Sequence, residues 1–193
     1  ALDSNLAEAY GIRGLTTARA WASAEAAALD FTRALELQPN SPDVHRWYST
    51  FLSRQDRFDE ALAEAERATA LDPLAPGIHI AFSYTALAAR RYDVAVQEAV
   101  RALALEPSLM RAQAFQGFGE LLSGHPDQCA SLSLGPYVGV RALCLYSQGR
   151  VAEAARIAAS LRTGFTARTL GDSLFSPVLA ARGLAEYYAW TGN

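Results

Sequence analysis

The chain has 193 residues, of which 51% are hydrophobic and 19% are charged, and its formal net charge at pH 7 is −3. This amount of apolar material suits one substantial core or a linear stack of smaller ones, and it excludes a disordered chain. All 17 basic residues are arginines that form no run longer than two, so the sequence lacks the clustered positive charge that nucleic-acid binding requires.

Hydropathy and cysteine spacing indicate where in the cell this segment is expected to be. No uncharged apolar run of about 18 residues occurs, and the first residues lack the basic flank and apolar stretch of a signal peptide. We therefore expect no membrane span or export signal in this segment, and a cytoplasmic location. Cys129 and Cys144 lie 15 positions apart without C-x-x-C spacing, which favours two small buried thiols and leaves a disulfide open.

The part of the chain before Met110 is built from a regular repeat. Pro39, Pro73 and Pro107 follow one another at equal intervals, and each ends a segment with the pattern Ala-x-x-Leu-x-Pro. Before each of the later prolines, alanines at spacings of four and three mark one face of a helix, and a polar turn precedes that helix. Another amphipathic segment lies before the turn, at residues 44–52 and 78–87. Each copy is therefore expected to be a helical hairpin.

These residues resemble the tetratricopeptide-repeat family, whose unit of about 34 residues has small residues at positions 8, 20 and 27 and proline at position 32. Small side chains allow the two helices of a hairpin to cross closely, and the proline ends the second helix. The resemblance implies an all-α fold, a right-handed superhelical solenoid of antiparallel helical hairpins. With position 1 at Pro42, Pro76 and Met110, the small residues are Ser49, Ser83 and Gly117, then Ala61, Ala95 and Cys129, and then Ala68 and Ala102.

The first copy also resembles a sub-family. It has one extra residue in its turn, where Trp21 and its neighbours replace the usual Gly-Asp-Tyr type of sequence. This turn, followed by residues 33–40 and a His-Arg-Trp-Tyr helix, is similar to repeat arrays in multidomain bacterial signalling proteins. Winged-helix regulators, nucleotide cyclases and Ser/Thr kinases are among those proteins.

After Met110 the period slips, because Gly135 and Pro136 end a second helix early. We expect a single solenoid over residues 1–193 that is a fragment of a longer chain. A first helix without its partner exposes an apolar face, which would allow end-to-end self-association. The expected repeats are 7–41, 42–75, 76–109, a shortened 110–134, 135–177 with a long connection at 162–175, and a lone first helix at 178–193.

No catalytic motif is present, so we predict no enzyme, no cofactor and no metal site. Residues 170–173 lack the pattern of a nucleophile elbow, and residues 117–119 lie in a helical pattern rather than after a strand. His45 and His79 share one repeat position without a third ligand at metal-binding spacing, so we expect packed side chains there. The charged residues expected to form a solvated helix face are Arg57, Asp59, Glu60, Glu64, Glu66 and Arg67.

In the tetratricopeptide family the first helix of each hairpin lines a concave groove that binds extended peptides or partner helices. The lining positions carry five arginines against three acids in this chain, which favours a mildly acidic and apolar ligand. Core packing stays open as an alternative for Trp47, Phe115 and Phe118. The candidate groove residues are Arg19, Arg46, Trp47, Thr50, Arg54, Tyr84, Arg111, Phe115, Phe118, Tyr146 and Arg182, and the same positions include Asp43, Ser53 and Ile80.

The favoured function is a non-enzymatic interaction scaffold that binds a peptide or protein segment in this groove, where aromatic and arginine side chains suit an interface. The alternative is a ligand- or partner-sensing regulatory module of a larger bacterial signalling protein or transcriptional regulator. Its small-molecule site would lie in the irregular repeats at 110–134 and 135–177, since irregularity in a repeat array is often functional. We expect neither nucleic acid nor a membrane as a partner of this segment.

Overall fold

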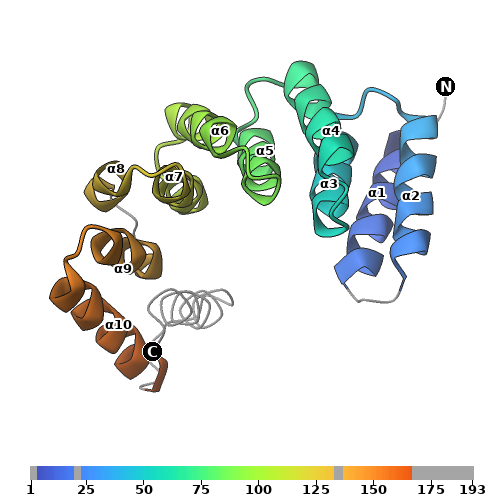
Figure 1. Ribbon diagram of the computed structural model, residues 1–193. Coiled ribbons are helices and arrows are strands. Elements are labelled where there is room, and N and C mark those ends of the chain that lie inside the picture. The colour runs from blue at the N-terminus through green and yellow to red at the C-terminus, as the bar shows by residue number, and fades with distance from the viewer. Residues whose placement is uncertain (1–3, 20–22, 133–136, 167–193) are drawn as a thin grey trace. The chain divides into compact units, whose positions relative to one another are not determined.

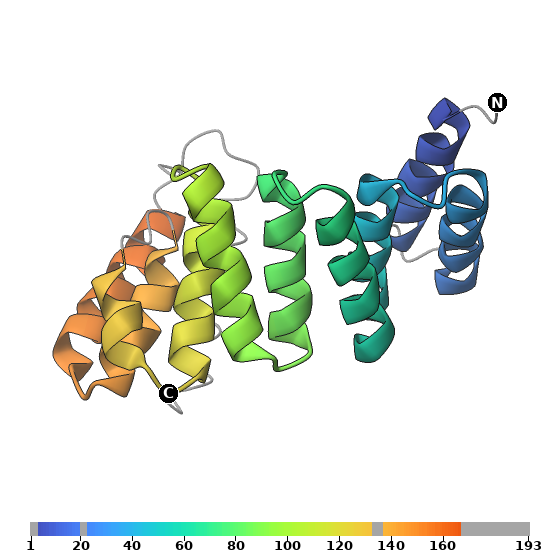
Figure 2. The same ribbon diagram turned by 90° about the horizontal axis from the view of Figure 1, so that it is seen from above.

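α-Helices are the only regular secondary structure in the residues that the structure, a computed structural model, describes: 4–19, 23–132 and 137–166 (Figure 1). The chain divides into two compact units, unit 1 at residues 1–107 and unit 2 at residues 108–193, and each is considered by itself. Consecutive helices pair as hairpins within each unit (Figure 2), which confirms the predicted all-α fold of helical hairpins. Unit 1 contains α1 (Ser4–Arg19), α2 (Ala24–Leu37), α3 (Pro42–Arg54), α4 (Phe58–Leu71), α5 (Pro76–Ala88) and α6 (Tyr92–Leu105); unit 2 contains α7 (Met110–Leu122), α8 (Pro126–Ser131), α9 (Val138–Ser147) and α10 (Val151–Thr166).

The helices of unit 1 begin and end where the sequence supplies caps and prolines. Pro42 and Pro76 stand in the first turn of α3 and α5, where a missing backbone donor is tolerated. The hydroxyl of Ser41 accepts a hydrogen bond from the Val44 amide at 3.4 Å. At the other end, the amides of Gln38, Asp72 and Glu106 donate to the carbonyls of Ala34, Ala68 and Ala102 at 2.9, 3.1 and 2.9 Å, and a proline follows each one.

Of the hairpins that the structure describes, the last four use a left-handed backbone at repeat position 15 of their turn. The φ angle is 57° at Asp56, 58° at Arg90, 86° at Gly124 and 76° at Gly149. Glycine adopts this conformation without a steric penalty, whereas a residue with a β-carbon costs about 1–2 kcal/mol, less for aspartate. The helical packing therefore imposes the turn geometry even where the sequence offers no glycine.

Close helix crossings in unit 1 depend on the small residues at repeat positions 8, 20 and 27. The hydroxyl of Ser83 on α5 donates to the Ala95 carbonyl of α6 at 2.8 Å. A β-carbon added at Gly14 on α1 would lie 3.2 Å from the Ala27 carbonyl oxygen of α2. Larger side chains at these positions would force the helices apart. The alanines that are fully buried at these crossings are Ala27, Ala34, Ala61, Ala68, Ala95 and Ala102.

Two buried histidines correct the interpretation of the charged residues. His45 Nδ1 lies 2.5 Å from Glu64 Oε2, and an equivalent contact is made by His79 in the next repeat. The prediction that Glu64 belongs to a solvated helix face is therefore wrong, because α4 directs its carboxylate toward α3. Arg57 and Glu60, expected on the same face, do form an exposed ion pair, with nitrogen–oxygen distances of 2.7 and 2.6 Å.

Unit 2 keeps the hairpins but changes their packing. Helix α8 has only six residues. Cys129 of α8 and Cys144 of α9 are joined in a disulfide, with Cα atoms 5.8 Å apart. Of the two possibilities left open by the sequence, the structure has the disulfide rather than the favoured pair of buried thiols, because these helices bring both residues into one fully buried core.

The C-terminal part of unit 2 differs from the sequence interpretation in one further respect. Helix α10 continues to Thr166. Residues 162–166, which the sequence assigns to a connection, are therefore helical. The lone helix expected at 178–193 lies outside the described residues.

Candidate functional site

Four of the predicted groove residues of unit 1 lie on one helix. Arg46, Trp47, Thr50 and Arg54 are all on α3, and Tyr84 has the repeat position of Thr50 on α5, which packs against α3. We name these five residues the α3–α5 face. Arg19 is the last residue of α1 and its side chain lies outside the described part of the chain, as does Arg182 as a whole.

Trp47 is both a packing residue and a surface residue. Its side chain is half-buried and packs against the core cluster that contains Phe31 and Val44. A β-carbon added at Gly11 of α1 would lie 2.8 Å from Cε3 of the Trp47 ring, so the glycine provides the space that the indole occupies. The alternative of core packing is therefore correct for part of this residue, and the remaining part is accessible.

The arginines of the α3–α5 face differ in how they are held. Arg46 Nη2 lies 2.7 Å from Asp43 Oδ1, and the Arg46 guanidinium carbon lies 5.4 Å from the centre of the Trp47 ring, within cation–π range. Arg54 is exposed and makes no ion pair with any residue that the structure describes. Thr50 directs its hydroxyl to the Arg46 carbonyl at 3.1 Å. The face therefore presents one guanidinium that is pre-oriented and one that is available to a partner.

Two of the predicted lining positions of unit 1 do not reach the surface. Ser53 and Ile80 are buried, and the Ser53 hydroxyl lies 3.2 Å from that of Thr85 at the contact between α3 and α5. The prediction that they line a groove is wrong because neighbouring hairpins pack at these positions. Ile12 of α1, 52% exposed, was missed, and the signal for it is the extra residue in the first turn, which aligns Ile12 rather than Arg13 with Trp47.

Two of the predicted groove residues of unit 2 pack against its core. Phe118 of α7 and Tyr146 of α9 are half-buried and pack against the core around the disulfide. Phe115 is also half-buried, and Arg111 on the same helix is exposed. Core packing therefore accounts for part of Phe118, as it does for part of Trp47.

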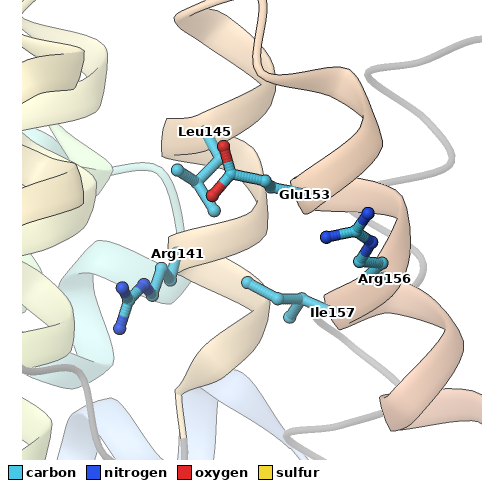
Figure 3. Close-up of a pocket in the computed structure, with 5 residues that line it drawn as sticks. All are labelled: Arg141, Leu145, Glu153, Arg156 and Ile157. Atoms are coloured by element: carbon cyan, nitrogen blue, oxygen red, sulfur yellow. The ribbon is translucent and has the colours of Figure 1, made fainter.

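A cavity of about 390 Å³ opens to solvent between the two helices of the last described hairpin (Figure 3). Leu145 of α9 and Ile157 of α10 supply its apolar lining. Arg141 of α9, together with Glu153 and Arg156 of α10, supplies its charged groups. The sequence analysis did not identify this cavity, since its residues lie on two different helices and form no motif.

Of the charged groups that line the cavity, only Glu153 forms an ion pair among the described residues. Arg150 donates to both carboxylate oxygens of Glu153 at 2.7 and 2.6 Å, and these hydrogen bonds hold the pKa of Glu153 below its usual value. Arg141 and Arg156 add smaller coulombic contributions in the same direction and form no ion pair with any described residue. The cavity therefore combines an apolar lining with two guanidinium groups that form no ion pair among the described residues.

The described part of the chain contains neither of two further kinds of feature, a cluster of metal ligands and a membrane-spanning helix. No three side chains of His, Cys, Asp or Glu gather there in an arrangement that could hold a metal ion. Within the same residues, none of the helices combines the length and apolar character needed to cross a bilayer.

No protein-family model and no curated protein matches this sequence. Solved structures do resemble it. TTC0263, a tetratricopeptide-repeat protein of Thermus thermophilus, is 21% identical with a TM-score of 0.66, and the match covers 93% of this chain and 99% of that one. The first tetratricopeptide domain of Spaghetti (RPAP3), bound to the HSP90 peptide SRMEEVD, is 19% identical with a TM-score of 0.56, over 63% and 97% of the two chains.

YrrB, described as a tetratricopeptide protein with an unusual peptide-binding site, is 17% identical with a TM-score of 0.54, and the match covers 84% of each chain. The likeness agrees with the hairpins, the buried small residues at positions 8, 20 and 27, and the prolines that follow the second helices. The chain therefore has the tetratricopeptide-repeat fold.

Proposed function

We propose that this chain is a non-enzymatic interaction scaffold that binds a peptide or protein segment on the α3–α5 face. The observation that carries the proposal is the combination on α3 of an accessible part of Trp47, a pre-oriented Arg46 and an exposed Arg54 without an ion-pair partner among the described residues. Aromatic and arginine side chains dominate the energetics of protein interfaces. Similar folds bind peptides in two of the matched structures, which supports the same class of function here.

The preferred partner is mildly acidic and apolar. Asp43 already neutralises Arg46 in part, so the main unsatisfied charge of the face is that of Arg54. A carboxylate next to an apolar side chain would contact Arg54 and the accessible part of Trp47 at the same time. The helices carrying these residues pack as a preformed surface, which limits the entropy lost on binding.

An array of heptapeptides that contain zero to three acidic residues beside Leu, Met or Val tests this proposal. Binding is expected to strengthen with each acidic residue, and Arg54→Gln is expected to remove most of that dependence. Arg33→Gln is the matched control, because Arg33 is an exposed arginine on α2 that already pairs with Glu36. Binding that is independent of peptide charge, or equally weak in both variants, would contradict the proposal.

A second candidate function is the sensing of a small ligand, and the cavity of unit 2 favours it. An apolar carboxylate would fit the lining of Leu145 and Ile157 and pair with Arg141 or Arg156. Such a site would suit a regulatory module of a larger bacterial signalling protein, the sub-family that the sequence resembles. Thermal-shift measurements with benzoate, phenylacetate and hexanoate, using chloride as a control, test it. Stabilisation that survives Arg141→Gln as fully as Arg33→Gln would eliminate the cavity as the site.

The remaining expectations also stay proposals. The absence of a catalytic motif supports a non-enzymatic role, and end-to-end self-association would involve residues outside the described part of the chain. The expected cytoplasmic location conflicts with the bond between Cys129 and Cys144, since disulfides persist mainly in oxidising compartments. Mass spectrometry of the protein isolated under thiol-blocking conditions would show which of the two expectations holds.

A further inference from the structure

The cavity of unit 2 lies at repeat positions where the first hairpin has an ion pair of its own. Counted from residue 135, Arg141 has repeat position 7 and Ile157 has repeat position 23. In the first hairpin these two positions belong to Arg13 and Asp30, once the extra residue in its turn is allowed for. The two hairpins therefore show an arginine at position 7 with and without a carboxylate at position 23.

In the first hairpin the arginine at position 7 is paired across the two helices. Arg13 Nε donates to Asp30 Oδ2 at 2.8 Å, and Arg13 Nη2 donates to Asp30 Oδ1 at 2.5 Å. Two parallel hydrogen bonds of this kind are the strongest way for a guanidinium to hold a carboxylate. Position 23 of a second helix thus brings an acid within reach of position 7 of the first helix.

The fifth hairpin has the arginine and lacks the acid. Ile157 of α10 replaces the aspartate, and Arg141 of α9 forms no ion pair with any residue that the structure describes. Arg156, next to Ile157 in the chain, likewise has no ion-pair partner among those residues, and the second hairpin has Ala63 at its position. Two guanidinium groups therefore line a site whose internal carboxylate is absent.

The space beside Arg141 is filled by side chains in the second hairpin. Tyr48 has position 7 there, and its ring stacks on Phe31 of α2 with the ring centres 5.3 Å apart. Helix α8, which precedes α9 as α2 precedes α3, ends at Ser131. Phe31 has position 24, two positions beyond that of Ser131, so helix α8 ends before an equivalent residue. The shortened helix and the change from tyrosine to arginine account for the cavity.

The charged groups of the cavity come from both of its walls. Arg141 extends from α9 and Arg156 from α10, and in Figure 3 the two apolar residues of the lining lie between them. Glu153 is the acid of the lining, and Arg150 already donates to both of its carboxylate oxygens. The cavity therefore offers two positive groups on different helices with an apolar surface between them.

We propose that this cavity binds a small dicarboxylate with an apolar middle, one carboxylate of which pairs with Arg141 and the other with Arg156. The first carboxylate takes the role that Asp30 has in the first hairpin. The methylene groups between the two carboxylates contact the apolar lining. This inference rests on the small-ligand function proposed for unit 2, and it names the class of ligand.

The proposal predicts a preference for two carboxylates over one. A monocarboxylate of the same length pairs with one guanidinium and leaves the other without a partner. Both arginines are exposed, so solvent screens each pair. We therefore expect the second carboxylate to strengthen binding by about fivefold.

Isothermal titration calorimetry of the full chain at constant ionic strength tests this preference with matched acids. The pairs are glutarate and pentanoate, adipate and hexanoate, and pimelate and heptanoate, with sulfate as the measure of general anion binding. In at least one pair the dicarboxylate is expected to bind about fivefold more tightly than the monocarboxylate. The length at which this ratio is largest gives the spacing between the two guanidinium groups.

Two variants at exposed positions test which residues are responsible. Arg141→Gln and Arg156→Gln should each abolish the preference, because the remaining guanidinium pairs equally well with either acid. Arg33→Gln on α2 is the matched control and should keep the preference, since Arg33 already pairs with Glu36.

A third variant gives the fifth hairpin the acid that the first hairpin has. In Ile157→Asp the new carboxylate should pair with Arg141 as Asp30 pairs with Arg13, and the preference for a dicarboxylate should again be lost. Ile157 is half-buried, so circular dichroism is needed to show that this variant keeps its helices. If it unfolds, the two glutamine variants decide the question.

The outcomes distinguish this inference from the function on which it rests. Equal binding of both acids in every pair, weakened by Arg141→Gln, would overturn the dicarboxylate class and leave a site for small carboxylates. A preference that either glutamine variant retains, or sulfate binding as tight as that of adipate, would show that the two arginines do not form the site. If none of the acids binds, both the inference and the small-ligand function are wrong.

Discussion

Unit 1 and unit 2 solve the same packing problem in different ways. In unit 1 the helices that follow each turn have 14 residues, and rows of fully buried alanines let them approach the first helices closely. In unit 2 the corresponding helix α8 has six residues and can supply little packing surface. A disulfide and a core that includes Leu121, Leu143 and Leu145 hold the shortened helix there. A hairpin repeat thus tolerates a shortened helix when a cross-link adds to its remaining contacts.

The two units also differ in their buried polar pairs. Each hairpin of unit 1 has a carboxylate at the same repeat position, in Asp30, Glu64 and Glu98, and each contacts an arginine or a histidine on the first helix. The repeats of unit 2 carry Leu132 and Ile157 at that position. Unit 1 therefore depends on electrostatic pairing at its hairpins, and unit 2 depends on apolar and covalent contacts.

The largest effect is expected from removing a buried carboxylate in unit 1. Glu98→Ala leaves His79 and Arg101 without their partner and should lower the free energy of unfolding by about 3 kcal/mol. Glu64→Ala should cost less, because water reaches the partly exposed Glu64 site. Urea denaturation of both variants at pH 6.5 measures the difference. Equal losses would show that burial does not set the strength of these pairs.

Reduction of the disulfide should affect unit 2 alone. Opening the bond between Cys129 and Cys144, which lie 15 positions apart in the sequence, is expected to cost about 3 kcal/mol. Hydrogen exchange followed by mass spectrometry, with and without a phosphine reductant, localises the effect. Amides of α8 and α9 should exchange faster while those of α3 to α6 keep their rates. Faster exchange throughout unit 1 would contradict the separation of the two units.

Acidification should weaken the first hairpin of unit 1. Hydrogen bonds from Arg13, at 2.8 and 2.5 Å, hold the pKa of Asp30 below its usual value against the opposing effect of burial. The stabilisation is therefore present above about pH 4 and is lost as the pH falls through the lowered pKa.

The matched variant is Asp30→Asn, which should cost about 1 kcal/mol at pH 7, because the Arg13 side chain is 63% exposed. It should also lose less stability than the wild type between pH 4 and pH 2. Thermal denaturation over this range is the measurement. If the variant lost as much stability at low pH as the wild type, Asp30 would not be the source of the acid sensitivity of unit 1.

The smallest effect is expected at the turns, where the two units use different residues in one conformation. Arg90→Gly in unit 1 should stabilise the chain by up to about 1 kcal/mol, because Arg90 holds a φ angle of 58°. Asp56→Gly should gain less, since aspartate tolerates this conformation better. Gly149→Ala in unit 2 is the reverse change and should destabilise. Melting temperatures of the three variants test the order.

Much of the fold could be predicted because short stretches of sequence indicate where helices end and where they cross. Pro39, Pro73 and Pro107 mark the helix ends at equal intervals, and buried alanines mark the crossings. The candidate site was less accessible to prediction. Trp47 and Arg54 could be placed on one helix from their spacing, but the burial of Ser53 and Ile80 depends on how closely α3 and α5 pack.

The sequence by itself determined the period, the hairpins and the shortened fourth repeat, because helix periodicity, proline and glycine act over short stretches of chain. Only the tertiary structure decided which partner each polar group found. Glu64 looks solvent-facing beside Arg67, and it is the approach of α4 to α3 that directs it to His45. The cysteines likewise show no motif, yet α8 and α9 bring them together. Contacts between helices depend on side-chain packing across the whole unit, which no local pattern encodes.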